Sequence, residues 1–232
     1  DRTDPKALFS EAKISKAKLV YLANPDNPMG SWHDASTLEK SFEDLPEDTL
    51  LLLDEAYGEF APDRTLPSID VNDPRIVRLR TFSKAYGMAG ARVGYAIGNA
   101  DVLGNLEKVR NHFGMNRVAQ VGALTALKDQ DWLAHTVSST AQARERLSWI
   151  AGSNGLTPLP SATNFVTIDC GRDAAFATAV KDALVARGIF VRMPFSPPGN
   201  RCIRIGAGTP ANLDDVAKAL PLALDDATAT FG

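Results

Sequence analysis

The sequence contains few cysteines and histidines. Its 232 residues include only two cysteines, Cys170 and Cys202, and three histidines. A secreted domain held together by disulfides would need a larger, paired set, so we expect two buried thiols in a reducing cytoplasm. The histidines, His33, His112 and His135, lack the spacing of metal ligands, and we expect no metal site.

The chain also lacks long apolar runs and an excess of positive charge. Apolar runs such as residues 50–53 are far too short to span a bilayer, and the polar start is unlike a secretory signal. The 25 Lys+Arg and 28 Asp+Glu residues give a net charge of −3, without the basic surface of a nucleic-acid-binding protein. With 44% hydrophobic and 23% charged residues, the composition is typical of a globular protein. We therefore expect neither nucleic acid nor membrane as a partner.

In the first half of the chain, short apolar segments alternate with helical patterns. The expected strands cover residues 18–23, 50–53, 76–80 and 93–98, and the expected helices cover 36–42, 101–110 and 118–128. This alternation predicts an α/β fold with a parallel sheet. Ligands of such sheets bind at the carboxyl ends of the strands. Three segments are followed there by polar residues, Asn27, Asp54 and Lys84.

From about residue 131 the pattern changes to helices separated by short strands. The expected helices cover residues 131–151 and 173–187, a last helix is capped by Asn212, and the expected strands cover 163–169, 189–192 and 201–205. Phe176, Val180 and Leu184 share one face of the helix at 173–187. We therefore expect a large domain over residues 1–130. A smaller α+β domain over 131–232 would begin with a long interdomain helix.

Asp54 and Lys84 are the first candidates for chemistry. Asp54 follows four leucines, where a bare buried charge would be costly. It could cap a helix, form an ion pair, or balance a cofactor cation such as the protonated pyridine ring of pyridoxal phosphate. Tyr57 and Asn27 could then donate to the phenolic oxygen of that ring. Lys84 could form a Schiff base, although single lysines are usually solvated surface charges.

Hydroxyls and arginines provide candidate anion sites. Thr81, Ser83 and Arg92 could form a phosphate cup, since a guanidinium fork suits phosphate; they could equally be turn hydroxyls and a surface ion pair. Arg204 stands in the short apolar strand 202–205. It could form an internal ion pair or bind a substrate carboxylate or phosphate. Arg192 ends the preceding expected strand and could join it.

Taken together, these motifs resemble a known family. The segments are residues 24–30 (Asn-Pro-Asp-Asn-Pro-Met-Gly), 54–57 (Asp-Glu-Ala-Tyr), 81–84 (Thr-Phe-Ser-Lys), 92–94 (Arg-Val-Gly), 164–165 (Asn-Phe) and 202–205 (Cys-Ile-Arg-Ile). In this order they resemble the class I/II aminotransferases among the fold-type I pyridoxal-phosphate enzymes, and most of all the histidinol-phosphate aminotransferase branch. The resemblance covers nearly the whole chain. It implies a large domain with a mainly parallel sheet, incomplete here, and a smaller α+β C-terminal domain.

The resemblance also implies pyridoxal 5'-phosphate as the cofactor, with a role for each matched residue. Lys84 would be the Schiff-base lysine and proton shuttle, and Asp54 would pair with the pyridine nitrogen. The other implied cofactor ligands are Asn27 and Tyr57 at the phenolic oxygen, and Thr81, Ser83 and Arg92 at the phosphate.

The implied substrate ligands lie mostly in the C-terminal half. Arg204 would bind the acidic group of the substrate, Arg192 matches a position that helps to bind the phosphate of histidinol phosphate, and Asn164 and Asn27 would line the pocket. The implied reaction moves an amino group from histidinol phosphate or an amino acid to a 2-oxo acid such as 2-oxoglutarate. The resemblance further implies a cytoplasmic homodimer with small-molecule partners.

Two departures from the family pattern and three alternatives accompany this interpretation. Met29 stands where the family usually has Thr. The sequence, which begins at Asp1, lacks the family's Gly-rich phosphate turn, its ring-stacking aromatic residue and its earlier strands. We therefore expect that the N-terminal part is missing. A decarboxylase of the phosphothreonine type would use the same cofactor, and a non-catalytic sensor domain could bind it. A nucleotide-binding module is disfavoured, because Gly87, Gly90 and Gly94 lack the Gly-x-Gly-x-x-Gly spacing.

Overall fold

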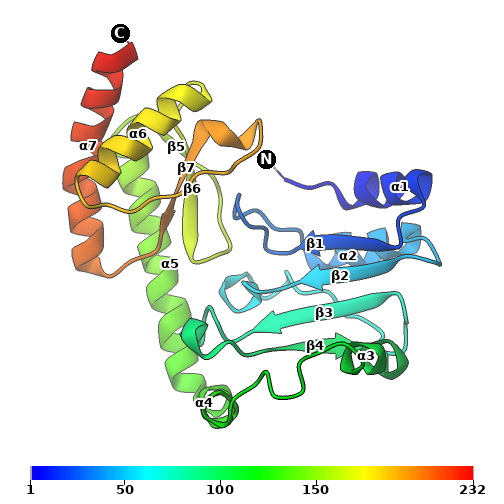
Figure 1. Ribbon diagram of the computed structural model, residues 1–232. Coiled ribbons are helices and arrows are strands. Elements are labelled where there is room, and N and C mark those ends of the chain that lie inside the picture. The colour runs from blue at the N-terminus through cyan, green and yellow to red at the C-terminus, as the bar shows by residue number, and fades with distance from the viewer. Residues whose placement is uncertain (1, 232) are drawn as a thin grey trace. The chain divides into compact units, whose positions relative to one another are not determined.

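The computed structural model describes residues 2–231, which divide into two compact units (Figure 1). The first unit comprises residues 2–26 and 32–137, and the second comprises residues 27–31 and 138–231. The short segment 27–31 therefore belongs to the same unit as the C-terminal half of the chain. The domain boundary predicted at 130/131 stays a prediction; the compact units divide within a continuous helix at 137/138.

A four-stranded sheet forms the centre of the first unit (Figure 1). Its strands, in spatial order, are β1 (Leu19–Ala23), β2 (Leu50–Asp54), β3 (Ile76–Thr81) and β4 (Gly94–Gly98). The first three run parallel, as predicted, whereas β4 is antiparallel to β3. The sheet is thus mainly parallel, as predicted, and β4 runs the other way because the loop 82–93 contains no crossover helix and brings the chain back along β3.

The helices of the first unit are α1 (Pro5–Ser15), α2 (Ala35–Ser41), α3 (Ala100–Glu107) and α4 (Arg117–Lys128), with 3-10 turns η1 (Phe42–Asp44), η2 (Gly58–Phe60) and η3 (Ala89–Ala91). Helix α1, which was not predicted, begins at a proline and is capped by Asp4. Phe9 of α1 and Leu38 of α2 are buried with Leu51 and Leu53 of β2 in one apolar cluster. The other leucines of β2 are only half-buried, so the expected cover on both faces is incomplete in the described chain.

The second unit combines a small antiparallel sheet with three helices. Its elements are α5 (Gln130–Ser153), which begins in the first unit, β5 (Thr157–Pro158), β6 (Phe165–Asp169), α6 (Ala174–Ala186), η4 (Gly199–Arg201), β7 (Cys202–Gly206) and α7 (Pro210–Phe231). Phe176, Val180 and Leu184 of α6 are buried, which confirms the predicted apolar face. Both cysteines, Cys170 and Cys202, are buried free thiols, also as predicted.

Two local predictions in this unit are wrong. The strand expected at 189–192 is reduced to a single bridge between Arg192 and Arg204. Asn212 does not cap the last helix, because Pro210, which is favoured at a first helical position, starts α7 earlier. The Asn212 side chain instead accepts hydrogen bonds from the backbone N–H and the hydroxyl of Thr209.

Within residues 2–231, no helix is long and apolar enough to cross a membrane. The same residues contain no cluster of three or more His, Cys, Asp or Glu side chains arranged to hold a metal ion.

Candidate active site

The parallel strands bring several predicted site residues to one edge of the larger sheet. Asp54 is the last residue of β2 and Thr81 is the last residue of β3, and the two strands are neighbours with Asp54 in register with Leu79. Ser83 and Lys84 lie two and three residues after Thr81. This is the carboxyl edge, where parallel sheets bind their ligands.

The Asp54 carboxylate is oriented by two donors. Its Oδ1 accepts a hydrogen bond from the backbone N–H of Ala56 at 2.9 Å. Its Oδ2 accepts one from the hydroxyl of Tyr21 on β1 at 2.5 Å. Burial, followed by the hydrogen bond to Asp54, raises the pKa of Tyr21 well above its usual value, so the phenol keeps its proton at neutral pH.

Sequence reasoning missed Tyr21, although a signal was present. Ala23 pairs with Asp54 across the sheet, and residues two apart on a strand share a face. Tyr21 therefore stands on the face of β1 that is shared with Ala23, within reach of the end of β2.

Tyr57 and Lys84 lie close together beyond the ends of β2 and β3. Tyr57 is buried in the turn that leads into η2. The Lys84 Nζ lies 5.1 Å from the centroid of the Tyr57 ring. An amine and a phenol are thus neighbours at the edge that also carries the Asp54 carboxylate.

The loop that carries Lys84 is held at its base. The backbone N–H of Phe82 donates to the carbonyl of Val93 at 3.1 Å, and that of Met88 donates to the carbonyl of Phe82 at 2.9 Å. Phe82 and Val93 also pack against Ala119 and Ala123 of α4 in a small apolar cluster. These contacts fix the start and the end of the loop on which Lys84 stands.

The predicted phosphate ligands occupy the same loop. The Thr81 hydroxyl oxygen accepts a hydrogen bond from the backbone N–H of Ser83 at 3.1 Å, so its own proton is directed elsewhere. Arg92 closes η3 with a left-handed backbone, at φ 54°. Its exposed guanidinium donates to the carbonyl of Ala89 at 2.9 Å.

Four charged side chains beside this edge form a buried network that sequence reasoning did not identify. Glu55 Oε2 lies 2.8 Å from Arg78 Nε and 3.3 Å from Arg80 Nη1. Arg80 Nη2 donates to Glu59 Oε1 at 2.6 Å. Burial raises the pKa of Glu55 to about 6, against the opposing effect of the two arginines. One signal for it was present in the sequence, since Arg78 and Arg80 alternate along β3 and acidic residues follow the end of β2.

The predicted substrate ligands gather in the second unit. Arg204 on β7 donates through Nη1 to the side-chain oxygen of Asn27, and its guanidinium lies 4.6 Å from the centroid of the Phe165 ring. Arg192 is joined to Arg204 by paired backbone hydrogen bonds of 3.1 and 2.7 Å. The backbone carbonyl of Asn164 accepts from the N–H of Ala207 at 2.8 Å.

The segment that carries Asn27 is fixed to this unit by further contacts. The Thr167 hydroxyl donates to the carbonyl of Pro28 at 2.6 Å, and the N–H of Ala162 donates to the carbonyl of Gly30 at 2.9 Å. Asn27 and Arg204, two residues predicted to contact substrate, thereby belong to one compact body.

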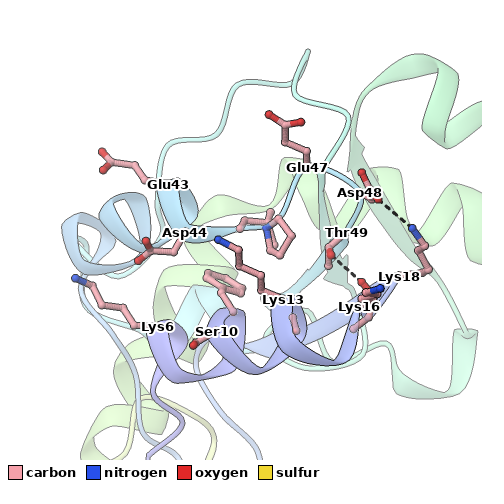
Figure 2. Close-up of a pocket in the computed structure, with 15 residues that line it drawn as sticks. Lys6, Ser10, Lys13, Lys16, Lys18, Glu43, Asp44, Glu47, Asp48 and Thr49 are labelled. Atoms are coloured by element: carbon pink, nitrogen blue, oxygen red, sulfur yellow. Dashed lines mark hydrogen bonds and ion pairs between the residues drawn. The ribbon is translucent and has the colours of Figure 1, made fainter.

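A hollow in the first unit contains none of these residues. It has a volume of about 1060 Å³ and is lined by α1 and the segment 43–49. Figure 2 shows lysines and acidic residues around it, with Lys18 paired to Asp48 at 3.2 Å. Lys18 and Thr49 directly precede β1 and β2, so this hollow lies at the amino ends of the strands. Parallel sheets bind ligands at the opposite edge, so the hollow is a poor candidate for the active site.

A smaller hollow of about 400 Å³ adjoins the Lys84 loop. It is lined by Ala85, Tyr86 and Met88 from the loop, and by residues of α4 and the start of α5. Its lining is mainly apolar, and it contributes surface beside Lys84 rather than reactive groups.

The groups at the carboxyl edge match the chemistry of pyridoxal phosphate. A protonated pyridine nitrogen needs a carboxylate, which Asp54 offers with fixed orientation. An aldehyde needs an amine, and Lys84 stands beside the Tyr57 phenol. Thr81 and Ser83 add hydroxyls on the same loop. The residues present therefore fit this cofactor.

Comparison with known proteins defines the class. Residues 3–220 match the family described as aminotransferase class I and II, and the chain belongs to this family. It is 35% identical to histidinol-phosphate aminotransferase 2 of Hydrogenovibrio crunogenus, over 87% of this chain and 54% of that protein. It is 38% identical to the aromatic amino acid aminotransferase of Nocardia farcinica, over 87% of this chain and 56% of that protein.

A solved structure extends the comparison to three dimensions. The histidinol-phosphate aminotransferase of Sinorhizobium meliloti, crystallised with pyridoxal-5'-phosphate, superimposes with a TM-score of 0.95 at 49% identity. The match covers 97% of this chain and 62% of that chain. The fold is thus that of the fold-type I aminotransferases, as predicted, and the chain spans a little over half the length of these relatives.

Proposed function

We propose that the protein to which this chain belongs is a pyridoxal-phosphate-dependent aminotransferase. The observation that carries the proposal is the meeting of the Asp54 carboxylate, the Tyr57 phenol and the Lys84 amine at the carboxyl edge of β2 and β3. Membership of the class I and II family supports it. So does the likeness to a structure that was crystallised with this cofactor.

Bound pyridoxal phosphate would supply an aldehyde that condenses with amines and a ring that withdraws electrons from the Cα–H bond. Asp54 would hold the ring nitrogen in its protonated form, and Tyr57 and Asn27 would donate to the phenolic oxygen. Lys84 would bond to the cofactor in the resting state. After displacement by the substrate amine, its free amine would move the proton at Cα.

We infer that the amino donor carries an acidic group that binds Arg204. A guanidinium fork binds a carboxylate or a phosphate through two parallel hydrogen bonds, and Arg204 is oriented by Asn27 and the Phe165 ring. Arg192, joined to Arg204 by the backbone bridge, would add a second positive charge. Histidinol phosphate is the donor that this pair favours, and a 2-oxo acid such as 2-oxoglutarate would be the acceptor.

The same proposal includes a cytoplasmic homodimer. Apolar side chains that are exposed along α4 and the segment before it support an interface there. They are Val109, Phe113, Val118, Val121, Leu124 and Leu127. Two buried free thiols are typical of a protein from a reducing compartment.

The test uses the protein as its gene encodes it, mixed with pyridoxal phosphate and followed by visible absorption. We expect a band that borohydride fixes covalently and that Lys84→Ala abolishes. Histidinol phosphate should then convert the band and, with 2-oxoglutarate, give glutamate. Release of carbon dioxide from an amino-acid phosphate would instead indicate a decarboxylase, and binding without turnover of any amino donor would indicate a sensor. A wild-type protein that binds no cofactor would refute the proposal.

A further inference from the structure

The buried network of charges connects the two chain segments that carry Tyr57 and Lys84. Glu55 and Glu59 flank Tyr57 in the turn after β2, and Arg80 precedes Thr81 at the end of β3. Through its two terminal nitrogens, Arg80 contacts Glu55 at 3.3 Å and Glu59 at 2.6 Å. The Arg80 guanidinium thus contacts the turn on both sides of Tyr57.

The turn is closely packed around this guanidinium. A Cβ atom added at Gly58 would lie 3.1 Å from Leu66 and 3.5 Å from the guanidinium carbon of Arg80. Arg78, which lies on β3 like Arg80, contacts Glu55 at 2.8 Å and also donates to the carbonyl of Pro67. These contacts restrict the conformation of the Arg80 side chain.

Stability does not account for the presence of this network. The Glu55 side chain is 0% exposed and the Glu59 side chain 7% exposed. Buried ion pairs often contribute less stability than apolar residues of the same size. Moreover, Glu55 Oε1 is buried without a hydrogen-bond partner in the described chain, which adds a cost. A positional role next to the reactive groups explains why such charges stand here.

We propose, on the basis of the function proposed above, that Arg80 is a positioning residue for the cofactor site. By pairing with Glu55 and Glu59, it fixes the turn that carries Tyr57 against the strand that leads to Lys84. The Lys84 Nζ is thereby held 5.1 Å from the centroid of the Tyr57 ring. Arg80 acts through these neighbours and has no contact with the reacting atoms in this assignment.

The fork of the guanidinium, rather than its charge, is the essential feature. A lysine at this position keeps the positive charge but offers a single nitrogen, which cannot bind both carboxylates in the same way. Arg80→Lys therefore separates geometry from charge. Arg75, which precedes β3 and pairs with Asp73 at 2.8 Å, is the matched control because it lies at the other end of the same strand.

The experiment measures pyridoxal phosphate binding to the full gene-encoded protein by titration of the visible band. We expect Arg80→Lys to weaken binding about tenfold and to shift the pH midpoint of the band, and Arg75→Met to stay within about twofold of wild type. Glu59→Gln, which loosens one side of the turn, should fall between the two. It also replaces Arg80→Lys if that variant does not fold.

The outcomes separate this proposal from the proposed function. Folded Arg80→Lys and Glu59→Gln proteins that bind the cofactor with wild-type affinity and band would overturn the positioning role. Equal weakening by Arg75→Met would also overturn it, since the effect would then belong to the strand in general. Failure of the wild-type protein to bind pyridoxal phosphate contradicts the proposed function itself.

Discussion

The hydroxyl of Tyr21 donates a hydrogen bond to Oδ2 of Asp54 across two neighbouring parallel strands, at 2.5 Å. Because Ala56 donates to the other oxygen, both oxygens of the carboxylate are held in place. The partner of a ring nitrogen must point in one direction, and these two donors supply that constraint before any cofactor is bound.

We expect Tyr21→Phe to weaken pyridoxal phosphate binding about threefold to tenfold, because Asp54 loses one of its two orienting donors. Absorption titration measures the effect. Tyr95→Phe is the control, since it removes a hydroxyl from β4, a strand without any predicted cofactor ligand. Equal affinities of wild type and Tyr21→Phe for pyridoxal phosphate would show that the Tyr21 hydroxyl is not required to orient Asp54.

Arg204 is expected to determine the affinity for every substrate with an acidic group at that position. Arg204→Met should lower kcat/KM about 100-fold or more, since a charge-assisted, two-point contact is lost. Cofactor binding should fall much less than activity, because Arg204 reaches the predicted cofactor ligands only through its hydrogen bond to Asn27. Loss of the cofactor band together with activity would contradict this assignment.

Arg192 is expected to discriminate between donors. If it binds a substrate phosphate, Arg192→Met should raise KM about tenfold or more for histidinol phosphate and leave KM for phenylalanine or tyrosine within about twofold. Steady-state kinetics with both donor types gives the ratio directly. A uniform loss for all donors would show that Arg192 does not recognise the substrate phosphate selectively.

Much of the larger sheet could be predicted from sequence because its signals are local. The apolar run of β2 and the polar residues after β2 and β3 identify the strands and the edge where Asp54 and Lys84 meet. The direction of β4 could not be obtained in this way. It depends on how the loop 82–93 closes, and that closure is a contact between Phe82 and Val93 rather than a pattern.

The supporting residues were harder to predict for a physical reason. Tyr21 and Arg80 act through partners 33 and 25 positions away in sequence, Asp54 and Glu55. A tyrosine or an arginine within a strand has no local feature that distinguishes a supporting role from an ordinary surface one. Sequence motifs therefore pointed to candidate cofactor ligands but not to the groups that hold them.

Gly30 combines backbone strain with a close approach, and both can be tested. It has φ +81°, and an added Cβ would lie 2.6 Å from the Ser161 Oγ. Gly155 has a similar φ of +75° but open space around it. We expect Gly155→Ala to cost about 1 kcal/mol of unfolding free energy and Gly30→Ala clearly more, about 2–3 kcal/mol.

Urea denaturation of the two glycine variants gives these free energies. Combining Gly30→Ala with Ser161→Gly, which removes the opposing side chain, should recover part of the excess cost. Equal effects of the two single variants would show that the contact with Ser161 is relieved by a small shift and that only the backbone conformation matters.

Glu55 makes stability depend on pH in a direction that is unusual for a carboxylate in ion pairs. Because burial raises its pKa from 4.5 to about 6, the folded protein binds this proton more tightly than the unfolded chain does. The contribution of Glu55 to the free energy of unfolding therefore falls as pH rises from about 4.5 to about 6, by about 2 kcal/mol in total, and stays low at higher pH.

Glu55→Gln removes this dependence because the amide does not titrate. We expect the variant to gain stability relative to wild type as pH rises through this window, although it weakens the hold of Arg80 on the Tyr57 turn. Urea unfolding between pH 4.5 and pH 7.5 measures the difference in unfolding free energy between variant and wild type. Glu43→Gln, at an exposed position, is the control, and its difference from wild type should not change across this pH range. A variant that becomes less stable relative to wild type as pH rises would mean that Arg78 and Arg80 outweigh burial, so that the network stabilises the fold itself.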